Sequence, residues 1–322
     1  MHPALSVILL TTFIGVGQGL FIALACTEAL AVFDMLPAKP ERLFYTAGSV
    51  LSLLFLGAGL VSSFFHLGHP ERAWRSAAQW RTSWLSREVI VLPAFMGMVF
   101  LYGGAHWLGF DATAATLASG VGIPATLALG ALGMALSLAL FICTGMIYAC
   151  LPFIREWHSP LTLVNYTLLG CASGITLATL LAAFYATDLT RFFASGAMLT
   201  TLLALIARSA SLFRNSRLKP KSTLQTAIGI KHPKIVQITQ GFTGENFNTR
   251  EFFHARTKHF LRGIKWLFLL CGFVIPILLL GMQSIVAFEA AFIVQLTGLM
   301  AERWFFFAQA NHPQNLYYQA VA

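Results

Sequence analysis

The chain has 322 residues, of which 57% are hydrophobic and only 10% are charged, and its formal net charge is +9. Soluble domains carry about 25% charged residues, so this composition excludes an ordinary soluble protein and predicts an integral membrane protein. No soluble nucleic-acid-binding module is recognisable, and we expect no nucleic-acid partner despite the positive charge.

Eight apolar segments are long enough to cross a bilayer, which takes roughly 20 residues of helix. In chain order, we expect spans at about 6–33, 43–65, 89–108, 122–150, 161–186, 192–212, 263–283 and 285–307. The fourth segment is long for a single span, and Pro124 is expected to mark the start of its helix. The sequence predicts an all-α integral membrane fold, a bundle of eight transmembrane helices, with seven and nine as alternative counts.

Lysine and arginine are unevenly divided between the two sets of loops that eight spans define. They gather in 66–88 and 213–262, whereas the opposite loops contribute Lys39, Arg42 and Arg191. Because short basic loops stay on the cytoplasmic side, we expect both termini and the two basic segments in the cytoplasm. Such a face also attracts anionic membrane lipid.

The segment 213–262 is the one sizeable hydrophilic piece of the sequence. It contains many isoleucines and phenylalanines, whereas a flexible linker is poor in β-branched and aromatic residues. We therefore expect an ordered cytoplasmic loop between the sixth and seventh helices, packed on the bundle or on another subunit. A surface loop with limited local packing is the alternative.

Cysteine and histidine positions argue against a metal site in this chain. The cysteines lie in or beside spans and form no CxxC pair, whereas iron–sulfur clusters need several thiolates at set spacings. A b-type haem between helices needs two axial ligands, and His66 and His106 are expected on opposite membrane faces. We expect no metal, no haem and no iron–sulfur cluster.

The richest polar stretch is 66–88, with the sequence HLGHPERAWRSAAQWRTSWLSRE. His66 follows the second span, where it either caps the helix or exchanges a proton with a ligand head group. Arg87 and Glu88 enter the third span, where charges are costly unless they face the bundle interior. These three residues are candidates for a ligand site at the membrane edge.

Three further arginines in this stretch, Arg72, Arg75 and Arg81, lie within two residues of a tryptophan. Basic and aromatic residues at a membrane interface commonly anchor the protein. The same residues are candidates for docking a partner subunit.

Polar residues also occur within the spans. Gln18 lies among Gly15, Gly17 and Gly19, where close approach of helices is expected. Glu28 is a candidate for proton transfer, with a hydrogen-bonded structural carboxylate as the alternative. Another polar group, the phenol of Tyr148, closes the fourth span on the basic side and is available to a ligand or to the interface.

A transporter is the main alternative class from the residues alone, and a passive scaffold is the second. Transporters often carry inverted repeats and broken helices around a midplane site. The sequence shows no convincing internal repeat, and its polar residues gather towards one face. Both observations favour a site at the membrane edge.

The 66–88 stretch resembles the anchor subunits of dimethyl sulfoxide reductase, the DmsC family. The shared pattern is His-Leu-Gly-x-Pro-x-Arg-Ala followed by Ser-x-Leu-Ser-x-Glu. Its members here are His66, Leu67, Gly68, Pro70, Arg72, Ala73, Ser83, Leu85, Ser86 and Glu88. The opening MHPALSVILLTTFIGVGQGL and the loop STLQTAIGIKHPKIVQITQGFTGENFNTREFF look like SoeC-type anchors of sulfite dehydrogenase, whereas so long a loop is not expected in the DMSO reductase anchors.

The resemblance implies that 1–322 is a single membrane-anchor domain in a bacterial inner membrane. It implies a molybdopterin oxidoreductase complex with two cytoplasmic partners, a four-cluster iron–sulfur subunit and a molybdenum bis-pterin catalytic subunit. The implied reaction is sulfite oxidation with reduction of ubiquinone or menaquinone. The alternative is reduction of DMSO or a related S- or N-oxide with electrons from menaquinol.

The resemblance also assigns His66 to the quinone site. The other candidates for its walls, between the first four helices, are Gln18, Arg87, Glu88 and Tyr148. Docking of the iron–sulfur subunit is then expected at the three arginines of the 66–88 stretch and at the 213–262 loop.

Overall fold

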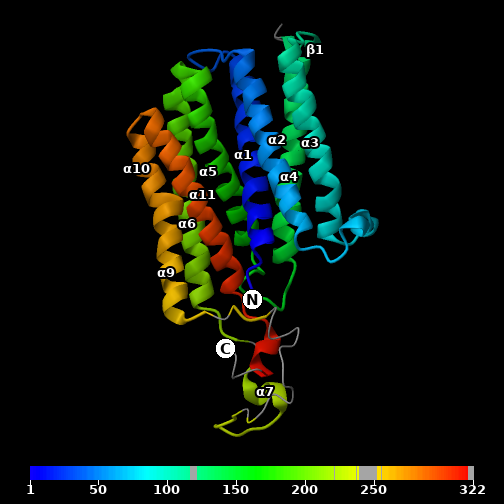
Figure 1. The fold of residues 1–322 in the computed structure, drawn as a ribbon, viewed down its shortest axis with the longest axis vertical. Coiled ribbons are helices and arrows are strands. Elements are labelled where there is room, and N and C mark those ends of the chain that lie inside the picture. The colour runs from blue at the N-terminus through cyan, green and yellow to red at the C-terminus, as the bar shows by residue number, and fades with distance from the viewer. Residues whose placement is uncertain (117–121, 221, 237, 239–251, 255, 318–322) are drawn as a thin grey trace.

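The computed structural model describes residues 1–116, 122–220, 222–236, 238, 252–254 and 256–317, and its long helices stand side by side in one bundle (Figure 1). Within these residues, eight helical segments are long and apolar enough to cross a membrane, which confirms the predicted number. They are α1 (Leu5–Val32), α2 (Arg42–Phe64), α3 (Trp84–Leu108), α4 (Ala125–Ala149), α5 (Pro160–Tyr185), α6 (Thr190–Ser216), the series α9 (Lys258–Leu269), η3 (Leu270–Val274) and α10 (Ile275–Gly281), and α11 (Ile285–Ala308).

The third span begins at Trp84, earlier than the position 89 expected from hydropathy. Ser83 caps its first turn, because the Ser83 hydroxyl accepts a hydrogen bond from the amide of Ser86. Hydropathy misses this turn because it contains polar residues. The earlier start places Glu88 within the helix.

The prediction of an all-α fold is wrong in one detail. β1 (Thr113–Thr116) and β2 (Gly122–Pro124) form a small antiparallel pair between α3 and α4, with Thr113 opposite Pro124. The strands are too short to produce a recognisable alternation of polar and apolar residues. Pro124 also precedes the first residue of α4, as its fixed backbone angle predicted.

The remaining elements are short and lie outside the bundle core. They are the 3₁₀ helices η1 (Pro70–Gln79), η2 (Thr187–Leu189) and η4 (Pro313–Tyr317), and the α-helix α7 (Leu224–Ile228). The cyan segment after α2, which contains η1, stands out from the side of the bundle (Figure 1).

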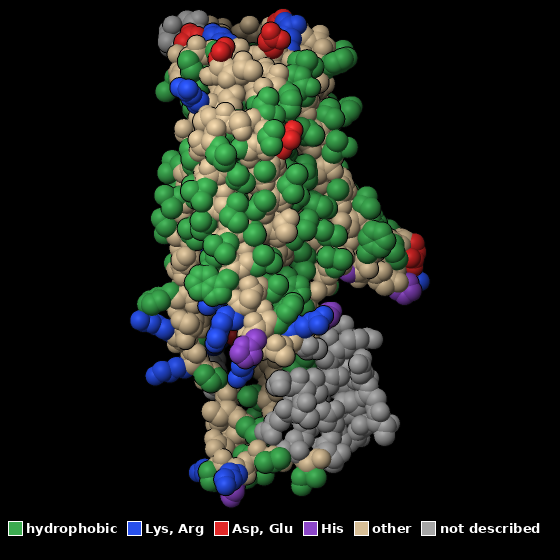
Figure 2. Space-filling view, turned by 60° about the vertical axis from the view of Figure 1, so that its left-hand side comes forward, with side chains coloured by type: hydrophobic (Ala, Val, Ile, Leu, Met, Phe, Trp, Pro, Cys, Tyr) green, Lys and Arg blue, Asp and Glu red, His purple; other side chains and the backbone are tan. Residues whose placement is uncertain are grey.

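The two ends of the bundle differ in charge. The end where α9 begins, here called the basic end, carries a group of lysine and arginine side chains below a wide hydrophobic belt (Figure 2). Both Met1 and the end of α11 lie there, and the Met1 amine donates a hydrogen bond of 2.8 Å to the carbonyl of Ala310. The other end, here called the opposite end, carries the 33–41 connection and the described residues 109–116 and 122–124.

Glycines allow α1 to lie deep among its neighbours. A Cβ atom on Gly19 would lie 2.1 Å from the Gly170 carbonyl oxygen, and one on Gly174 would lie 2.1 Å from the Gly19 carbonyl carbon. The backbones of α1 and α5 are therefore in direct contact, which confirms the close approach predicted for Gly15 to Gly19.

The seventh span is interrupted by the π-helical turn η3. Pro276 lacks the amide hydrogen that would bond to the carbonyl of Gly272, and a wider turn accommodates this loss. Gly298 of α11 packs on the same turn, since a Cβ there would lie 2.2 Å from the Gly272 nitrogen.

The predicted 213–262 loop is only partly visible, because 221, 237, 239–251 and 255 lie outside the described residues. Its first residues belong to α6, which ends at Ser216. Near its other end, the ring of Phe252 stacks on His312 at 3.9 Å. The Asn315 side chain also donates a hydrogen bond of 3.2 Å to the Phe252 carbonyl.

Candidate functional site

The residues predicted for quinone binding lie at or towards the basic end, but they do not form one open pocket. Gln18 and Glu88 line a small cavity, here called the hollow. Tyr148 does not line it, but its ring stacks on that of Tyr166, which does. His66 and Arg87 lie on the outside, in the connection that carries η1 and at the start of α3.

Glu88 faces inward from the second turn of α3 and is 9% exposed. The Thr144 hydroxyl of α4 donates a hydrogen bond to its Oε1 atom. No ion pair to Glu88 is present among the described residues. A buried carboxylate without a cationic partner carries a large desolvation cost, so its proton affinity is sensitive to any ligand beside it.

Gln18 contributes a second polar group from the middle of α1. Its Nε2 atom donates a hydrogen bond of 2.8 Å to the Ser137 carbonyl of α4, and the side chain is 1% exposed. The hollow has a volume of about 10 Å³, which is room for a single water. Its walls are Leu10, Thr11, Ile14, Gly15, Gln18, Glu88, Phe141, Thr144 and Tyr166.

These walls come from α1, α3, α4 and α5, so α5 takes the place expected for α2. Tyr166 is the α5 residue that sequence analysis missed, and its buried hydroxyl has no hydrogen-bond partner within the described part of the chain. Its ring stacks on that of Tyr148, with centroids 5.7 Å apart. Tyrosines near span ends are common at interfaces, so the sequence offered no sign that this one faces inward.

Arg87 does not pair with its neighbour Glu88. Its Nε and Nη2 atoms donate hydrogen bonds of 2.9 and 2.7 Å to the carbonyls of Trp80 and Arg81, and its guanidinium lies 4.2 Å from the ring centroid of Trp84. Arg87 therefore holds the end of the η1 segment against the start of α3.

His66 is exposed just beyond α2, and its backbone amide donates a hydrogen bond of 3.4 Å to the carbonyl of Ser63. Partial burial of the imidazole lowers its pKa from the ordinary value of 6.5. The neutral ring therefore predominates at neutral pH, and it is able to accept a proton or a hydrogen bond.

The arginines predicted for docking are all exposed on the projecting connection between α2 and α3, which contains η1. Arg75 lies 5.8 Å from the ring centroid of Trp74, and Arg81 lies 5.2 Å from that of Trp80. Trp74 is 73% exposed. Together with Arg72, these residues form a basic and aromatic surface at the basic end.

A family model described as "DMSO reductase anchor subunit (DmsC)" matches residues 1–309. The chain belongs to the DmsC family. The C subunit of the sulfite dehydrogenase of Allochromatium vinosum is 52% identical to it over 326 aligned positions, with 100% of both chains covered. The resemblance seen in the 66–88 stretch and in the 213–262 loop is thereby confirmed, and the chain is a multi-pass membrane protein of an oxidoreductase anchor family.

Three buried charged side chains of α6 and α11 form a cluster next to the hollow. Arg208 Nε lies 2.8 Å from Glu302 Oε1, and Arg303 Nη1 lies 3.4 Å from Glu302 Oε2. The Arg303 guanidinium lies 3.7 Å from the ring centroid of Tyr166. Tyr166 thus connects the hollow of Glu88 to this cluster, a relation that residue spacing alone does not reveal.

Glu28, the candidate for proton transfer, lies elsewhere. It is ten residues beyond Gln18, or about 15 Å along α1, near the opposite end of the bundle. Its contacts are with α3 and α4 residues of that end, namely His106 and Thr126.

Proposed function

We propose that this chain is the quinone-reactive membrane anchor of a sulfite-oxidising molybdopterin complex in a bacterial inner membrane. The observation that carries the proposal is the full-length identity of 52% with the C subunit of a sulfite dehydrogenase. Membership of the DmsC family supports the anchor role. The partners would be a four-cluster iron–sulfur subunit and a molybdenum bis-pterin catalytic subunit on the cytoplasmic side.

The partners would dock at the basic end. Arg72 and Arg75 of η1 and Arg81 just beyond it present their charges on the segment that projects from the bundle. A basic surface with exposed tryptophans suits an acidic partner face, because aromatic and arginine side chains carry much of the energy of protein interfaces. This placement brings a partner cluster to the same end as Glu88.

The donor set at the hollow suits a quinone, which gains two electrons and two protons on reduction to a quinol. Gln18 and Tyr166 can donate hydrogen bonds to carbonyl oxygens, and Glu88 can hold and release a proton. A ring is larger than the single water for which the hollow has room, so binding requires bordering side chains such as Phe141 to move. His66, at the surface of the same end, would exchange the proton with water.

The test uses the assembled complex of anchor, iron–sulfur and catalytic chains. Glu88→Gln and His66→Ala are each expected to lower sulfite-dependent reduction of a ubiquinone analogue by about 100-fold or more, the usual scale for loss of general acid–base catalysis. Sulfite oxidation with a soluble electron acceptor should be unchanged, because the molybdenum site lies on another chain.

Glu41→Gln is the matched control, because its carboxylate is exposed and lies at the opposite end of the bundle, away from the hollow and the docking surface. It should leave quinone reduction unaffected. Wild-type rates of quinone reduction in Glu88→Gln, with the complex intact, would refute the site.

The description of the matching family model favours a second candidate, an anchor for reduction of DMSO or a related oxide. In that case menaquinol would bind at the same residues and release its two protons there, and its two electrons would pass to the iron–sulfur partner, which would be the oxidant. Assay of the complex with sulfite and with DMSO separates the two directions.

A further inference from the structure

A second cavity opens at the opposite end of the bundle. It has a volume of about 260 Å³ and lies among the ends of α1, α2, α3 and the start of α4. Its inner wall includes Glu28, Tyr45, His106 and Thr126. This space is many times that of the hollow at Glu88.

Glu28 is the only carboxylate of the inner wall and is 5% exposed. The Thr126 hydroxyl donates a hydrogen bond to its Oε1 atom, and His106 Nε2 lies 3.5 Å from the same oxygen. The second oxygen, Oε2, has no hydrogen-bond partner among the described residues. An unpaired carboxylate oxygen at this depth is costly and calls for a ligand or water beside it.

Two aromatic side chains complete the inner wall. The rings of Tyr45 and His106 stack with centroids 4.5 Å apart, and the ring of Tyr102 meets His106 edge-on at 4.6 Å. His106 Nε2 and the Tyr102 hydroxyl, like Glu28 Oε2, lack hydrogen-bond partners within the described ranges. The three unpaired atoms come from two helices and meet at one place.

The rim of the cavity is charged and exposed, so water reaches it. Arg42 pairs with Asp111 across the mouth, and Lys39 pairs with Asp34 at 2.6 Å. Lys39, Arg42 and Asp111 all line the cavity. A rim of this kind admits water and small ions rather than an apolar molecule.

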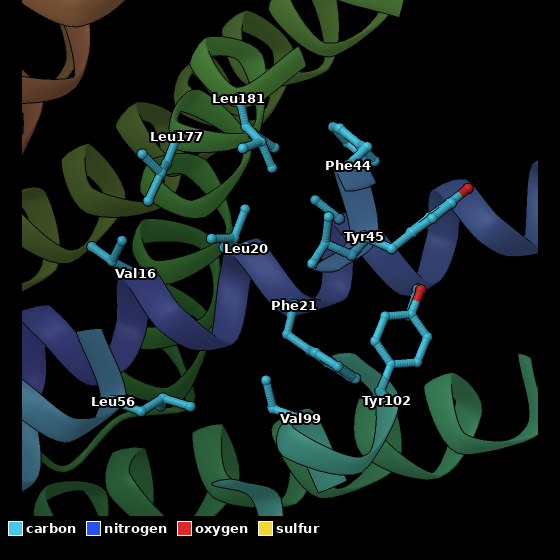
Figure 3. Packing of buried hydrophobic residues seen from close by; sticks show 14 of the residues in the cluster. Val16, Leu20, Phe21, Phe44, Tyr45, Leu56, Val99, Tyr102, Leu177 and Leu181 are labelled. Carbon is cyan, nitrogen blue, oxygen red and sulfur yellow. The ribbon is translucent and has the colours of Figure 1, made fainter. Parts of the chain in front are cut away.

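An apolar layer separates this cavity from the hollow at Glu88. Phe21, Phe95 and Val99 are each 0% exposed. The Phe21 ring lies beside Val99 and Tyr102 (Figure 3). Its centroid is 5.4 Å from that of Phe95 and 5.2 Å from that of Tyr102. Such an apolar layer offers no polar group to a proton on the way to the basic end.

We propose that Glu28 and His106 form a proton-binding site that equilibrates with the aqueous phase at the opposite end through this cavity. A proton from hydronium bonds to the Glu28 carboxylate, which becomes neutral, and water is left. The new carboxyl group can then donate a hydrogen bond to His106 Nε2. This step transfers a proton and no electron, so the site needs no redox partner.

The groups that set its proton affinity come from every neighbouring element. The Thr126 hydroxyl of α4 donates a hydrogen bond to the carboxylate. Tyr45 of α2 and Tyr102 and His106 of α3 face the site, and the charged groups of the rim are those of Arg42, Asp111 and Lys39. The proposal does not depend on the proposed quinone site.

The test follows the carboxyl stretching band of the full chain in lipid nanodiscs by infrared spectroscopy during a pH titration. All variants are made in a Glu88→Gln background, which removes the other buried carboxylate that lacks a cationic partner. In this background a band of a buried carboxyl group should grow on acidification and be lost when Glu28→Gln is added. The exposed Glu41 at the same end provides the matched control, and Glu41→Gln should keep the band. Thr126→Val should shift the frequency of the band, because it removes the hydroxyl that donates a hydrogen bond to Glu28 Oε1.

A one-sided pH jump on vesicles of known orientation then tests access. The band should follow the pH on the side of the 33–41 connection. Persistence of the band in Glu28→Gln, or a response to the side of η1, would overturn the proposal. Loss of the band on adding sodium at constant pH would also overturn it, because the site would then be a cation site. If Glu28→Gln does not fold, Thr126→Val and the pH jump still decide.

Discussion

Substitutions in the buried charged cluster of α6 and α11 provide a quantitative test of the packing. Arg208 is 2% exposed and Glu302 is 1% exposed, so both charges are removed from solvent. The cluster contains Arg208, Glu302 and Arg303, and its formal charge is +1. Glu302 is the common partner of the two arginines.

Because Glu302 pairs with both arginines, Glu302→Gln and Arg208→Met should lower the unfolding free energy by different amounts. Glu302→Gln leaves two buried guanidinium groups without a counterion, which should cost about 3–5 kcal/mol of unfolding free energy. Arg208→Met leaves Glu302 paired with Arg303 at 3.4 Å and keeps apolar contact with Phe268 and Phe305. Its expected cost is about 1–3 kcal/mol, the scale of one contact to a charged group.

The measurement is reversible unfolding in mixed detergent micelles, followed by far-UV circular dichroism as the denaturing detergent is increased. The double variant, Arg208→Met with Glu302→Gln, should lose less than the sum of the two single losses, because the pair is coupled. Equal destabilisation by the two single substitutions, or strict additivity in the double variant, would refute the assignment of Glu302 as the shared partner.

Two further predictions concern helix contact and docking. Gly174→Val should destabilise the bundle by about 1–3 kcal/mol through overpacking, because any Cβ there would meet the backbone at Gly19; Gly57→Val, with nothing within 4 Å of a Cβ, is the matched control in the same unfolding assay. Arg72→Glu combined with Arg81→Glu should release the partner subunits from washed membranes, whereas Lys39→Glu at the opposite end should not. Full retention after charge reversal would exclude docking at η1.

Helix positions were predictable because the signals are local. Each span is a continuous apolar run, and the short connections concentrate the polar residues. The start of α3 was missed because its first turn contains Ser86 and Arg87, which hydropathy counts as loop. The β1–β2 pair was missed because it depends on one contact between two very short segments.

The candidate site was predictable only in part. Glu88 stood out as a charge at a span entrance, and the structure places it inside the bundle. Arg87 was expected beside it, but successive residues on a helix point about 100° apart. One faces Thr144 and the other faces the η1 carbonyls, so adjacency in sequence did not mean adjacency in space.

Membrane class, the number of spans, the basic end and the family all follow from the order of amino acids, since apolar length, charge and local motifs do not depend on how helices pack. Only the folded bundle reveals which polar side chains contact one another. Glu28, His106 and Thr126 come from α1, α3 and α4, and Tyr166 reaches the hollow of Glu88 from α5. These contacts depend on the order and rotation of the helices in the bundle. Close backbone contacts, such as that between α1 and α5, determine that arrangement.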